Sequence, residues 1–434
     1  MVVDSNDSGI FSLASVGSYL DALSSITGEM SLRDRSNLIF IDKCLHDQWG
    51  LGQNVILNWS IEPEGLGLLV IPHYAVAEFS ERLQADGGSD GRSEGFASRP
   101  SEEFLRELLS RERHLSQAQM QKVGRLLGIE KTMIGLRSPV PRGSAQVRII
   151  ENMIRRYSIN YVPSRAVALF DIVGFSLLSP FEQMNQLNSL SYSLNAAQSK
   201  LLSKRIGINF ARSTTGDGFY IWNRDLTLEA NINLYHFMHL VLADNAIAQS
   251  KSRHPNVPQL RACFHVGSCY EFYQSEGLNP SLYNYIVGDV TVELARMIER
   301  ALPGQILVGE FHAELRSAPP PGERYVKLGS IDFVATAKES LAQLQGLELS
   351  GERVDAIKCY LTGAALGNGE FSIRRIVVND KHGISRHVFN AKINIYRRHA
   401  APIYLGIEDQ FIDRNSEPRS ALHPVQRLAA PYRL

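Results

Sequence analysis

The chain has 434 residues, and its 45 lysine and arginine side chains are balanced by 45 aspartate and glutamate side chains. Hydrophobic residues make up 44% and charged residues 21%, a balance typical of a globular protein with two or three domains. The zero net charge argues against a nucleic-acid partner. The longest apolar run, 66–71, predicts a buried strand, because it stops at Pro72 and is too short to cross a bilayer. With no secretory leader and no Cys-x-x-Cys pair, we expect a cytoplasmic protein with reduced thiols.

The first 150 residues contain no group of side chains that suggests catalysis. They predict a domain at 1–150 whose role is either regulatory or purely structural. A helix is expected at 12–23 and a short strand at 54–59. Residues 84–100 are rich in glycine, serine and charge, which predicts a flexible loop. Helical patterning then runs from 101 to about 127, with acidic residues in its first turn.

The character of the sequence changes near residue 160. The apolar run 166–170 predicts a buried central strand that ends at Asp171. From here to about residue 308, strands and helices are expected in the order strand, helix, strand, strand, helix, strand, strand, helix, strand. This order predicts an α+β domain with helices over one mixed sheet. The later strands are expected at 208–213, 219–222, 260–266, 285–287 and 305–308, and the helices at 180–201, 228–249 and 290–301.

The first of these helices has a clear start signal. Ser179 suits the cap, Pro180 the first turn and Glu182 the third helical position. Apolar residues then recur at helical spacing, so one face of the helix is expected to pack on a core. The residues of this face are Met184, Leu187, Leu190, Leu194 and Leu201.

Two aspartates each follow a predicted strand in a turn that contains glycine. Asp171 lies in FDIVGFS and Asp217 in TTGDGFY, and antiparallel neighbouring strands could bring them together. Two carboxylates and a backbone oxygen suit a pair of hard cations such as Mg²⁺ or Mn²⁺, which also bind substrate phosphates. The amides of Gly174, Phe175 and Ser176 can face a phosphate. The alternative is two ordinary turn aspartates.

Five motifs in order make the first interpretation more specific: FDIVGFS, TGDGF, RACFHVG, YIVGDVTVELAR and PGQILV. Together they resemble the class III adenylyl and guanylyl cyclase homology domain, which implies a ferredoxin-like, palm-type α+β fold over about 160–410. The resemblance is strongest over 163–310 and weaker at 377–383 and 393–407. Residues 315–365 are interpreted as an insertion, and 411–434 as a C-terminal tail.

The resemblance also implies a cation site and a reaction. Asp171, Asp217 and the carbonyl of Ile172 would hold two divalent cations, Mn²⁺ or Mg²⁺. The substrate would be a nucleoside triphosphate. Its ribose 3′-hydroxyl attacks the α-phosphorus in line and releases pyrophosphate, which leaves a 3′,5′-cyclic mononucleotide.

Other residues take their expected roles from the same resemblance. Arg261 matches an arginine that contacts the β- and γ-phosphates, and Arg296 matches one that stabilises the transition state. The alternative for Arg296 is a helix-surface ion pair with Glu293 or Glu299. Lys381 is a weaker match to a further phosphate contact. In this family two head-to-tail protomers share each active site, so the resemblance implies a homodimer in which one chain supplies the cations and its partner supplies Arg296.

Three positions depart from the family. Adenylyl cyclases have a lysine four residues before the second metal aspartate and an aspartate eleven before the catalytic arginine, where this chain has Ser213 and Tyr285. Guanylyl cyclases have a glutamate and usually a cysteine there. The ribose-orienting asparagine is replaced by Val292. A tyrosine can stack on a ring or donate one hydrogen bond, which suits a smaller pyrimidine pocket.

This set of residues is similar to the Pycsar class of bacterial pyrimidine cyclases, which act in antiphage defence. The similarity favours UTP, then CTP, as substrate, and implies a downstream cyclic-nucleotide-gated effector. The alternatives are an adenylate or guanylate cyclase in signalling and an inactive module that senses nucleotides. A diguanylate cyclase and a P-loop ATPase are disfavoured, because the sequence has neither a Gly-Gly-Asp-Glu-Phe signature nor a Walker loop.

Overall fold

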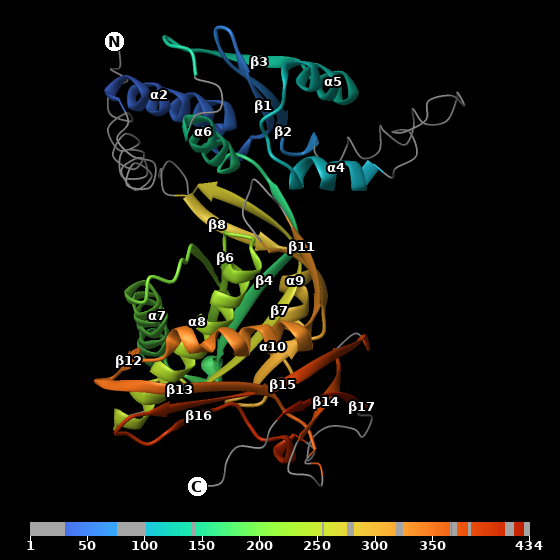
Figure 1. The fold of residues 1–434 in the computed structure, drawn as a ribbon. Coiled ribbons are helices and arrows are strands. Elements are labelled where there is room, and N and C mark those ends of the chain that lie inside the picture. The colour runs from blue at the N-terminus through green and yellow to red at the C-terminus, as the bar shows by residue number, and fades with distance from the viewer. Residues whose placement is uncertain are drawn as a thin grey trace. The chain divides into compact units, whose positions relative to one another are not determined.

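The computed structural model divides into two compact units (Figure 1), one of Met1–Val162 with Tyr270–Ile286 and one of Pro163–Cys269 with Val287–Leu434. The helix expected at 12–23 and the loop expected at 84–100 lie outside the residues that the structure describes. Among the described helices, none combines the length and the apolar character needed to span a membrane. The described residues are 31–75, 101–140, 145–253, 256–275, 282–317, 324–364, 366, 371–380, 383–412 and 421–428.

The first unit contains a three-stranded antiparallel sheet in the order β1-β2-β3. The expected strands at 54–59 and 66–71 are confirmed, and each is slightly longer than the pattern indicates. The strands are β1 (Asn54–Glu62), β2 (Gly65–Pro72) and β3 (Lys131–Gly135), and the helices are α2 (Leu32–Trp49), α4 (Ser101–Ser110), α5 (Gln117–Leu127) and α6 (Ala145–Arg155), with a 3-10 turn at Gly50–Gly52.

The prediction of continuous helix from 101 to 127 is wrong, because α4 ends at Ser110 and α5 begins at Gln117. Between them Arg113 is fully buried, and its guanidinium donates to the carbonyl oxygens of Leu57 at 3.1 Å and Leu109 at 3.0 Å. A buried guanidinium needs such acceptors, and binding them draws this stretch out of the helix. Ser116 then starts α5 with a capping box.

Twelve strands of the described chain form a mixed sheet with the main path β12-β13-β15-β9-β7-β4-β6-β5. The pair β7 and β9 is parallel, whereas β4 and β6, and β5 and β6, are antiparallel. The strands are β4 (Asn160–Ile172), β5 (Phe210–Thr214), β6 (Gly218–Asn223), β7 (Leu260–Ser275), β8 (Leu282–Val287), β9 (Ile306–Gly309), β12 (Glu348–Leu349), β13 (Glu352–Leu361), β14 (Phe371–Asn379), β15 (Ser385–Arg397), β16 (Ile403–Leu405) and β17 (Ala421–Leu428).

The helices of this region are α7 (Pro180–Ser203), α8 (Leu228–Lys251), α9 (Asp289–Ile298) and α10 (Ser330–Ser340). A separate two-stranded sheet pairs β10 (His312–Arg316) with β11 (Tyr325–Gly329), and short 3-10 turns lie at Phe175–Leu177, Leu341–Leu344 and Asp409–Phe411. The α+β class and the expected element order from β4 to β9 are confirmed. The segment 315–365, interpreted as an insertion, contributes β13 to the main sheet.

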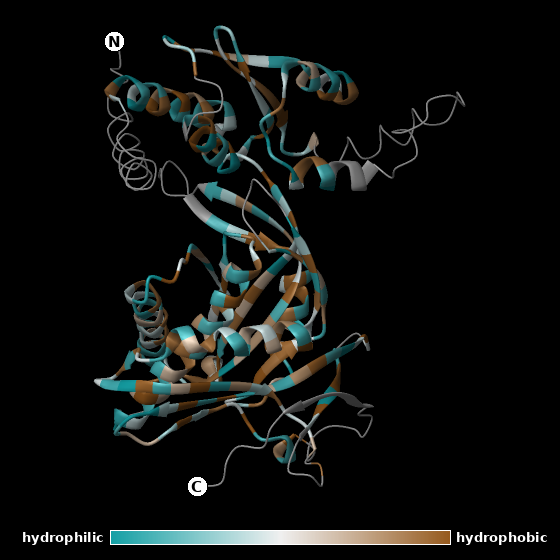
Figure 2. Ribbon diagram, in the orientation of Figure 1, coloured by the Kyte–Doolittle hydropathy of each residue, from teal (hydrophilic) through white to brown (hydrophobic). Residues whose placement is uncertain are grey.

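The two faces of this sheet carry different elements. Helices α7 and α8 lie side by side (Figure 1), joined by an ion pair between Lys200 and Asp244 at 3.0 Å. Together with α10 they cover alternate strand residues such as Phe170 and Phe264, and hydrophobic residues gather along these central strands (Figure 2). Gly267 is three residues after Phe264 on β7, so it faces the opposite side of the sheet. It lies against Val290 of α9, which means that α9 covers this other face.

The apolar face of α7 is shorter than its spacing predicts. Leu190, Leu194 and Leu201 are buried, and Leu187 packs partly against the core. The expectation that Met184 faces this core is wrong, because 52% of it is exposed. The capping box between Ser179 and Glu182 is present as predicted. The packed face of α7 therefore begins at Leu187, and Met184 one turn earlier is exposed.

Buried histidines should make this unit sensitive to acid. Burial lowers the pKa of His236 and of His265 to about 4, and lowers the pKa of His239 well below its usual value. Within the described chain neither ring nitrogen of His239 has a hydrogen-bond partner. Because the unfolded chain binds these protons with a usual pKa of 6.5, the free energy of unfolding should fall as pH drops from about 6.5 toward 4.

His239→Phe should therefore reduce the slope of the unfolding free energy against pH in this window. The expected change is up to about 1.4 kcal/mol per pH unit, since one proton fewer is taken up on unfolding. Urea denaturation at several pH values measures the slope. His312→Gln, at an exposed position, is the matched control. An unchanged slope for His239→Phe would show that His239 is not neutral in the folded chain.

Candidate active site

The two predicted aspartates lie at neighbouring strand ends. Asp171 on β4 is paired in register with Gly218, the residue after Asp217. The amide of Ile172 donates to the carbonyl oxygen of Asp217 at 3.1 Å. A side chain at position 218 would place its Cβ 1.9 Å from the carbonyl oxygen of Phe170, so only glycine allows β6 to approach β4 this closely. The glycine after Asp217 thus brings the two aspartates together.

Asp171 is buried and paired with an arginine. Only 6% of Asp171 is exposed, and its Oδ2 accepts a hydrogen bond from Nε of Arg261 at 2.6 Å. Burial raises the pKa of Asp171; the ion pair with Arg261 opposes this rise, and the nearby carboxyl of Asp217 adds to it. A second positive charge at this point would relieve the repulsion between the two carboxyls.

The donor set fits a hard divalent cation. Asp171 and Asp217 offer carboxylate oxygens at the ends of adjacent strands, and Ile172, the residue after Asp171, offers a backbone carbonyl oxygen. Within the described residues, no group of three or more His, Cys, Asp or Glu side chains is placed to hold a metal ion. Mg²⁺ and Mn²⁺ commonly use one or two carboxylates and complete their shell with water and substrate phosphates. Two carboxylates are therefore sufficient for such ions.

A glycine conformation and a backbone hydrogen bond to a distant segment shape the turn that follows Ile172. Gly174 has a φ of 69°, a left-handed conformation that favours glycine, and it begins the 3-10 turn Phe175–Leu177. The amide of Val173 donates to the carbonyl oxygen of Gln259 at 2.9 Å. The first amides of a helical turn have no acceptor inside it, so those of Phe175 and Ser176 suit an anion. Phosphate binding by this turn stays a prediction.

Arg261 is held at the carboxylates rather than extended away from them. Besides its bond to Asp171, its Nη1 donates to the carbonyl oxygen of Ala301 at 3.2 Å. The predicted contact with the β- and γ-phosphates stays a prediction. A guanidinium at this position nevertheless places a permanent positive charge beside the carboxyl of Asp171.

Arg296 lies on α9 with its side chain 22% exposed. Its Nη1 is 3.4 Å from Oε1 of Glu299, and its Nε is 3.8 Å from Oδ2 of Asp380. The alternative ion pair with Glu299 is thus present, whereas Glu293 binds Arg386 instead. These contacts within one chain are compatible with a role at the active site of a partner, and that role stays a prediction.

The other positions expected to contact the base, the ribose or a phosphate are spread over the chain. Ser213 on β5 is the direct cross-strand neighbour of Tyr220 on β6. Tyr285 on β8 belongs to the unit that contains residues 270–286 and stacks on Phe272, with ring centroids 5.7 Å apart. Val292 on α9 is 50% exposed. Lys381 lies outside the described residues, so its role is not addressed.

The sequence analysis missed Tyr220. Its hydroxyl donates to the backbone carbonyl oxygen of Thr291 at 3.2 Å and so connects β6 with α9. Burial raises its pKa, as do the nearby Cys263, Asp171 and Asp217. The alternation of β6 is the available signal, because it directs Tyr220 away from the core face that Ile221 occupies.

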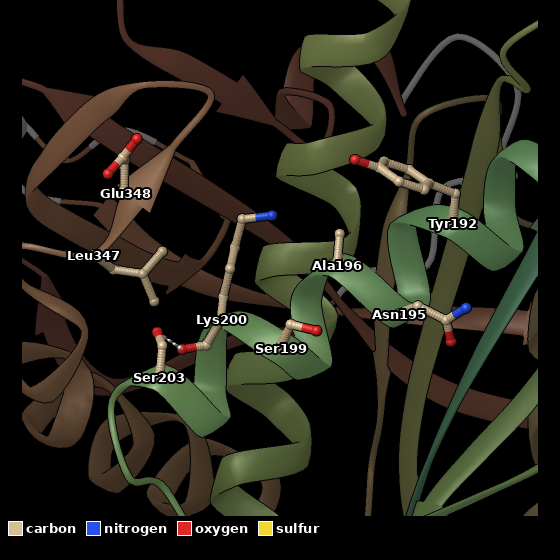
Figure 3. A pocket seen from close by; sticks show the side chains of 8 residues that line it. All are labelled: Tyr192, Asn195, Ala196, Ser199, Lys200, Ser203, Leu347 and Glu348. Atoms are coloured by element: carbon tan, nitrogen blue, oxygen red, sulfur yellow. Dashed lines mark hydrogen bonds between the residues drawn. The ribbon is translucent and has the colours of Figure 1, made fainter.

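A pocket of about 510 Å³ lies away from these residues, on α7 (Figure 3). Lys200 in this pocket is paired with Asp244, and Ser203 donates to the carbonyl oxygen of Lys200 at 2.7 Å. The pocket has no predicted catalytic residue in its lining. The lining residues are Tyr192, Asn195, Ala196, Ser199, Lys200, Ser203, Leu347 and Glu348.

No protein-family model matches the chain, and no curated protein sequence matches it. Among solved structures, it is similar to the guanylate cyclase domain of RhGC from Catenaria anguillulae in complex with GTP, with 13% identity, a TM-score of 0.32, and coverage of 55% of this chain and 99% of that one. The dimeric guanylyl cyclase domain of the RhoGC fusion protein from Blastocladiella emersonii is 14% identical, with a TM-score of 0.33 and coverage of 55% and 99%. The adenylyl cyclase CyaB from P. aeruginosa is 15% identical, with a TM-score of 0.31 and coverage of 56% and 100%.

Proposed function

We propose that this protein is a nucleotidyl cyclase, which converts a nucleoside triphosphate to a 3′,5′-cyclic mononucleotide and pyrophosphate. The observation that supports this most is the approach of Asp171 and Asp217 at the ends of two adjacent antiparallel strands. Their carboxyls are close enough for Asp217 to raise the pKa of Asp171. Paired carboxylates beside an ordered turn suit a triphosphate with its divalent cations.

In this proposal the chain's own residues position the substrate. Asp171, Asp217 and the carbonyl of Ile172 hold the divalent cations, which supply charge neutralisation at the triphosphate when bound. The amides of Phe175 and Ser176 orient phosphate oxygens of the substrate. Arg261, at the start of β7, offsets the negative charge of Asp171 and of the phosphates. As the ribose 3′-oxygen forms a bond to the α-phosphorus, its proton passes to solvent water; the bond from the α-phosphorus to the bridging oxygen of the β-phosphate breaks, and its electron pair leaves with pyrophosphate.

We propose that two copies of the chain share each site. Arg296 of one copy would then stabilise the charge that develops on the α-phosphate bound by the other, an effect worth several kcal/mol in comparable sites. Support comes from the position of Arg296 on α9, whose contacts leave 22% of its side chain exposed. A monomer would lack this charge and should be inactive.

We favour UTP, then CTP, as the substrate. The lysine or glutamate that reads a purine is replaced by Ser213, whose cross-strand neighbour is the bulky Tyr220. A pocket narrowed by an aromatic ring suits a single-ring base. On this proposal the product is a second messenger in antiphage defence that acts on a cyclic-nucleotide-gated effector.

Incubation with each of ATP, GTP, CTP and UTP in the presence of Mn²⁺ tests both parts of the proposal. We expect cyclic UMP as the main product, with cyclic CMP second, and pyrophosphate in equal amount. Chromatography against synthetic cyclic nucleotides identifies the base. Cyclic AMP or cyclic GMP as the main product would retain the cyclase and overturn the pyrimidine assignment.

The second candidate is a module that binds nucleotides without turnover. The observation in its favour is Val292, an exposed apolar residue where the family has its ribose-orienting asparagine. Such a module would bind a nucleoside triphosphate with Mn²⁺ and release no pyrophosphate from any of the four. Binding measured by calorimetry without pyrophosphate release would therefore replace the cyclase proposal with this one.

A further inference from the structure

A buried carboxylate lies beside Arg296, and it comes from a distant part of the chain. Asp380 follows β14 and is 6% exposed. One carboxylate oxygen accepts the amide of Ile384 at 2.9 Å, and the other accepts Nη1 of Arg386 at 2.7 Å. That second oxygen is also 3.8 Å from Nε of Arg296. Asp380 thus contacts two guanidinium groups, that of Arg386 on β15 and that of Arg296 on α9.

The same cluster attaches α9 to β15. Arg386, with a side chain 11% exposed, donates from Nε to the carboxylate of Glu293 on α9 at 2.7 Å. One guanidinium therefore connects Asp380 with α9, and Asp380 in turn faces Arg296, one helical turn after Glu293. The carboxylate and the helix that bears Arg296 are held in one geometry.

The charges indicate which contact orients Arg296. Its other partner, Glu299, has a side chain 46% exposed at 3.4 Å, and exposed ion pairs of this kind contribute little. The side chain of Asp380 is only 2% exposed. A charge in a less polar surrounding acts more strongly, and this favours Asp380 although its oxygen is 3.8 Å from Arg296, against 3.4 Å for Glu299.

We infer that Asp380 is a positioning residue for Arg296: it fixes the direction in which the guanidinium leaves α9. This inference rests on the proposed function, in which Arg296 faces the α-phosphate bound by a partner chain. Asp380 does not contact the substrate in this assignment. Its effect should appear in the rate of the chemical step and not in the binding of the nucleotide.

Asp380→Asn should lower kcat by about tenfold or more, since a displacement of about 1 Å at a reacting group can cost up to a hundredfold. KM for the nucleotide should change by less than about twofold, because the binding residues are intact. Steady-state kinetics with the nucleotide that the wild type accepts provides both values. Glu299→Gln and Glu310→Gln are the controls, and both should retain kcat. The first removes the exposed partner of Arg296, and the second removes an ion pair between Glu310, the residue after β9, and Arg375 on β14.

Mixing variants separates a positioning effect from a folding defect. A chain with Asp380→Asn mixed with Asp171→Asn should recover activity, because the mixed dimer has one site with its cations from the first chain and Arg296 from the second. Mixing with Arg296→Ala should give no recovery. Recovery of activity in the mixture with Arg296→Ala would overturn the inference. Failure of both mixtures to recover activity would overturn it as well.

Thermal unfolding gives a readout that does not need activity. In a double-variant cycle, the losses in Tm for Asp380→Asn and Arg296→Met should be less than additive, and the deviation should exceed that of the Glu299→Gln and Arg296→Met cycle. Additive losses would show that Asp380 and Arg296 are uncoupled and would overturn the inference. A wild type without turnover would overturn the proposed function and the positioning role together. Wild-type turnover with an undiminished Asp380→Asn rate would overturn the positioning role alone.

Discussion

Asparagine in place of Asp217 should lower cyclase turnover by about a thousandfold or more and leave the chain folded. The substitution keeps the size of the side chain but removes one of the two charges that hold the divalent cations, whose contribution to the transition state is several kcal/mol. Asp217 lies in the turn before Gly218 and is only half-buried. Loss of its charge should therefore lower the stability of the fold only slightly. Product formation per enzyme under saturating Mn²⁺ and nucleotide measures the effect.

Cation binding can be followed in the same variant without turnover. A cation that binds only the folded wild type at about 100 times its Kd adds about 2.7 kcal/mol of stability, which raises Tm. This rise should be absent from Asp217→Asn. Asp225→Asn, an exposed aspartate in the turn after β6, should keep both the rise and full turnover. Normal turnover by Asp217→Asn would show that these carboxylates are not the cation site.

Alanine in place of Arg296 should reduce kcat by roughly a hundredfold or more, because the guanidinium offsets charge that exists only in the transition state. Glu299 is exposed, and the buried carboxylate of Asp380 keeps its ion pair with Arg386 at 2.7 Å, so the fold should persist. Pre-steady-state product formation distinguishes a slower chemical step from slower product release. An unchanged rate would show that Arg296 is a helix-surface residue paired with Glu299.

Mixtures of the two variants test whether a site is shared between chains. With random pairing, half of the dimers are mixed, and each mixed dimer has one intact site of two, so about a quarter of the wild-type activity should return. A mixture of Asp217→Asn with Asp171→Asn is the control, because both changes affect the same half of the site. Activity in the control mixture but not in the first would contradict a head-to-tail arrangement.

The sequence predicted the elements whose signal is local. The apolar run before Asp171 and the Ser179, Pro180 and Glu182 start of α7 each reflect the physics of a few neighbouring residues, and both are present. Continuous helix over 101–127 was wrong because Arg113 finds its acceptors on β1, more than fifty residues away in sequence. Met184 fits the helical period of the apolar face, but it is exposed because the core does not extend to this part of α7.

The chain by itself determined the chemistry: which carboxylates and arginines are available, and that Asp171 and Asp217 each lie near the end of an expected strand in a segment that contains glycine. The tertiary structure alone decided which charges meet. Gly218 sets the approach of β6 to β4 through the space it leaves at Phe170, and Asp380 reaches Arg296 across more than eighty residues of sequence. Such contacts depend on strand register and on the packing of α9, and neither follows from local patterning, because a one-residue shift in register would turn every side chain to the opposite face.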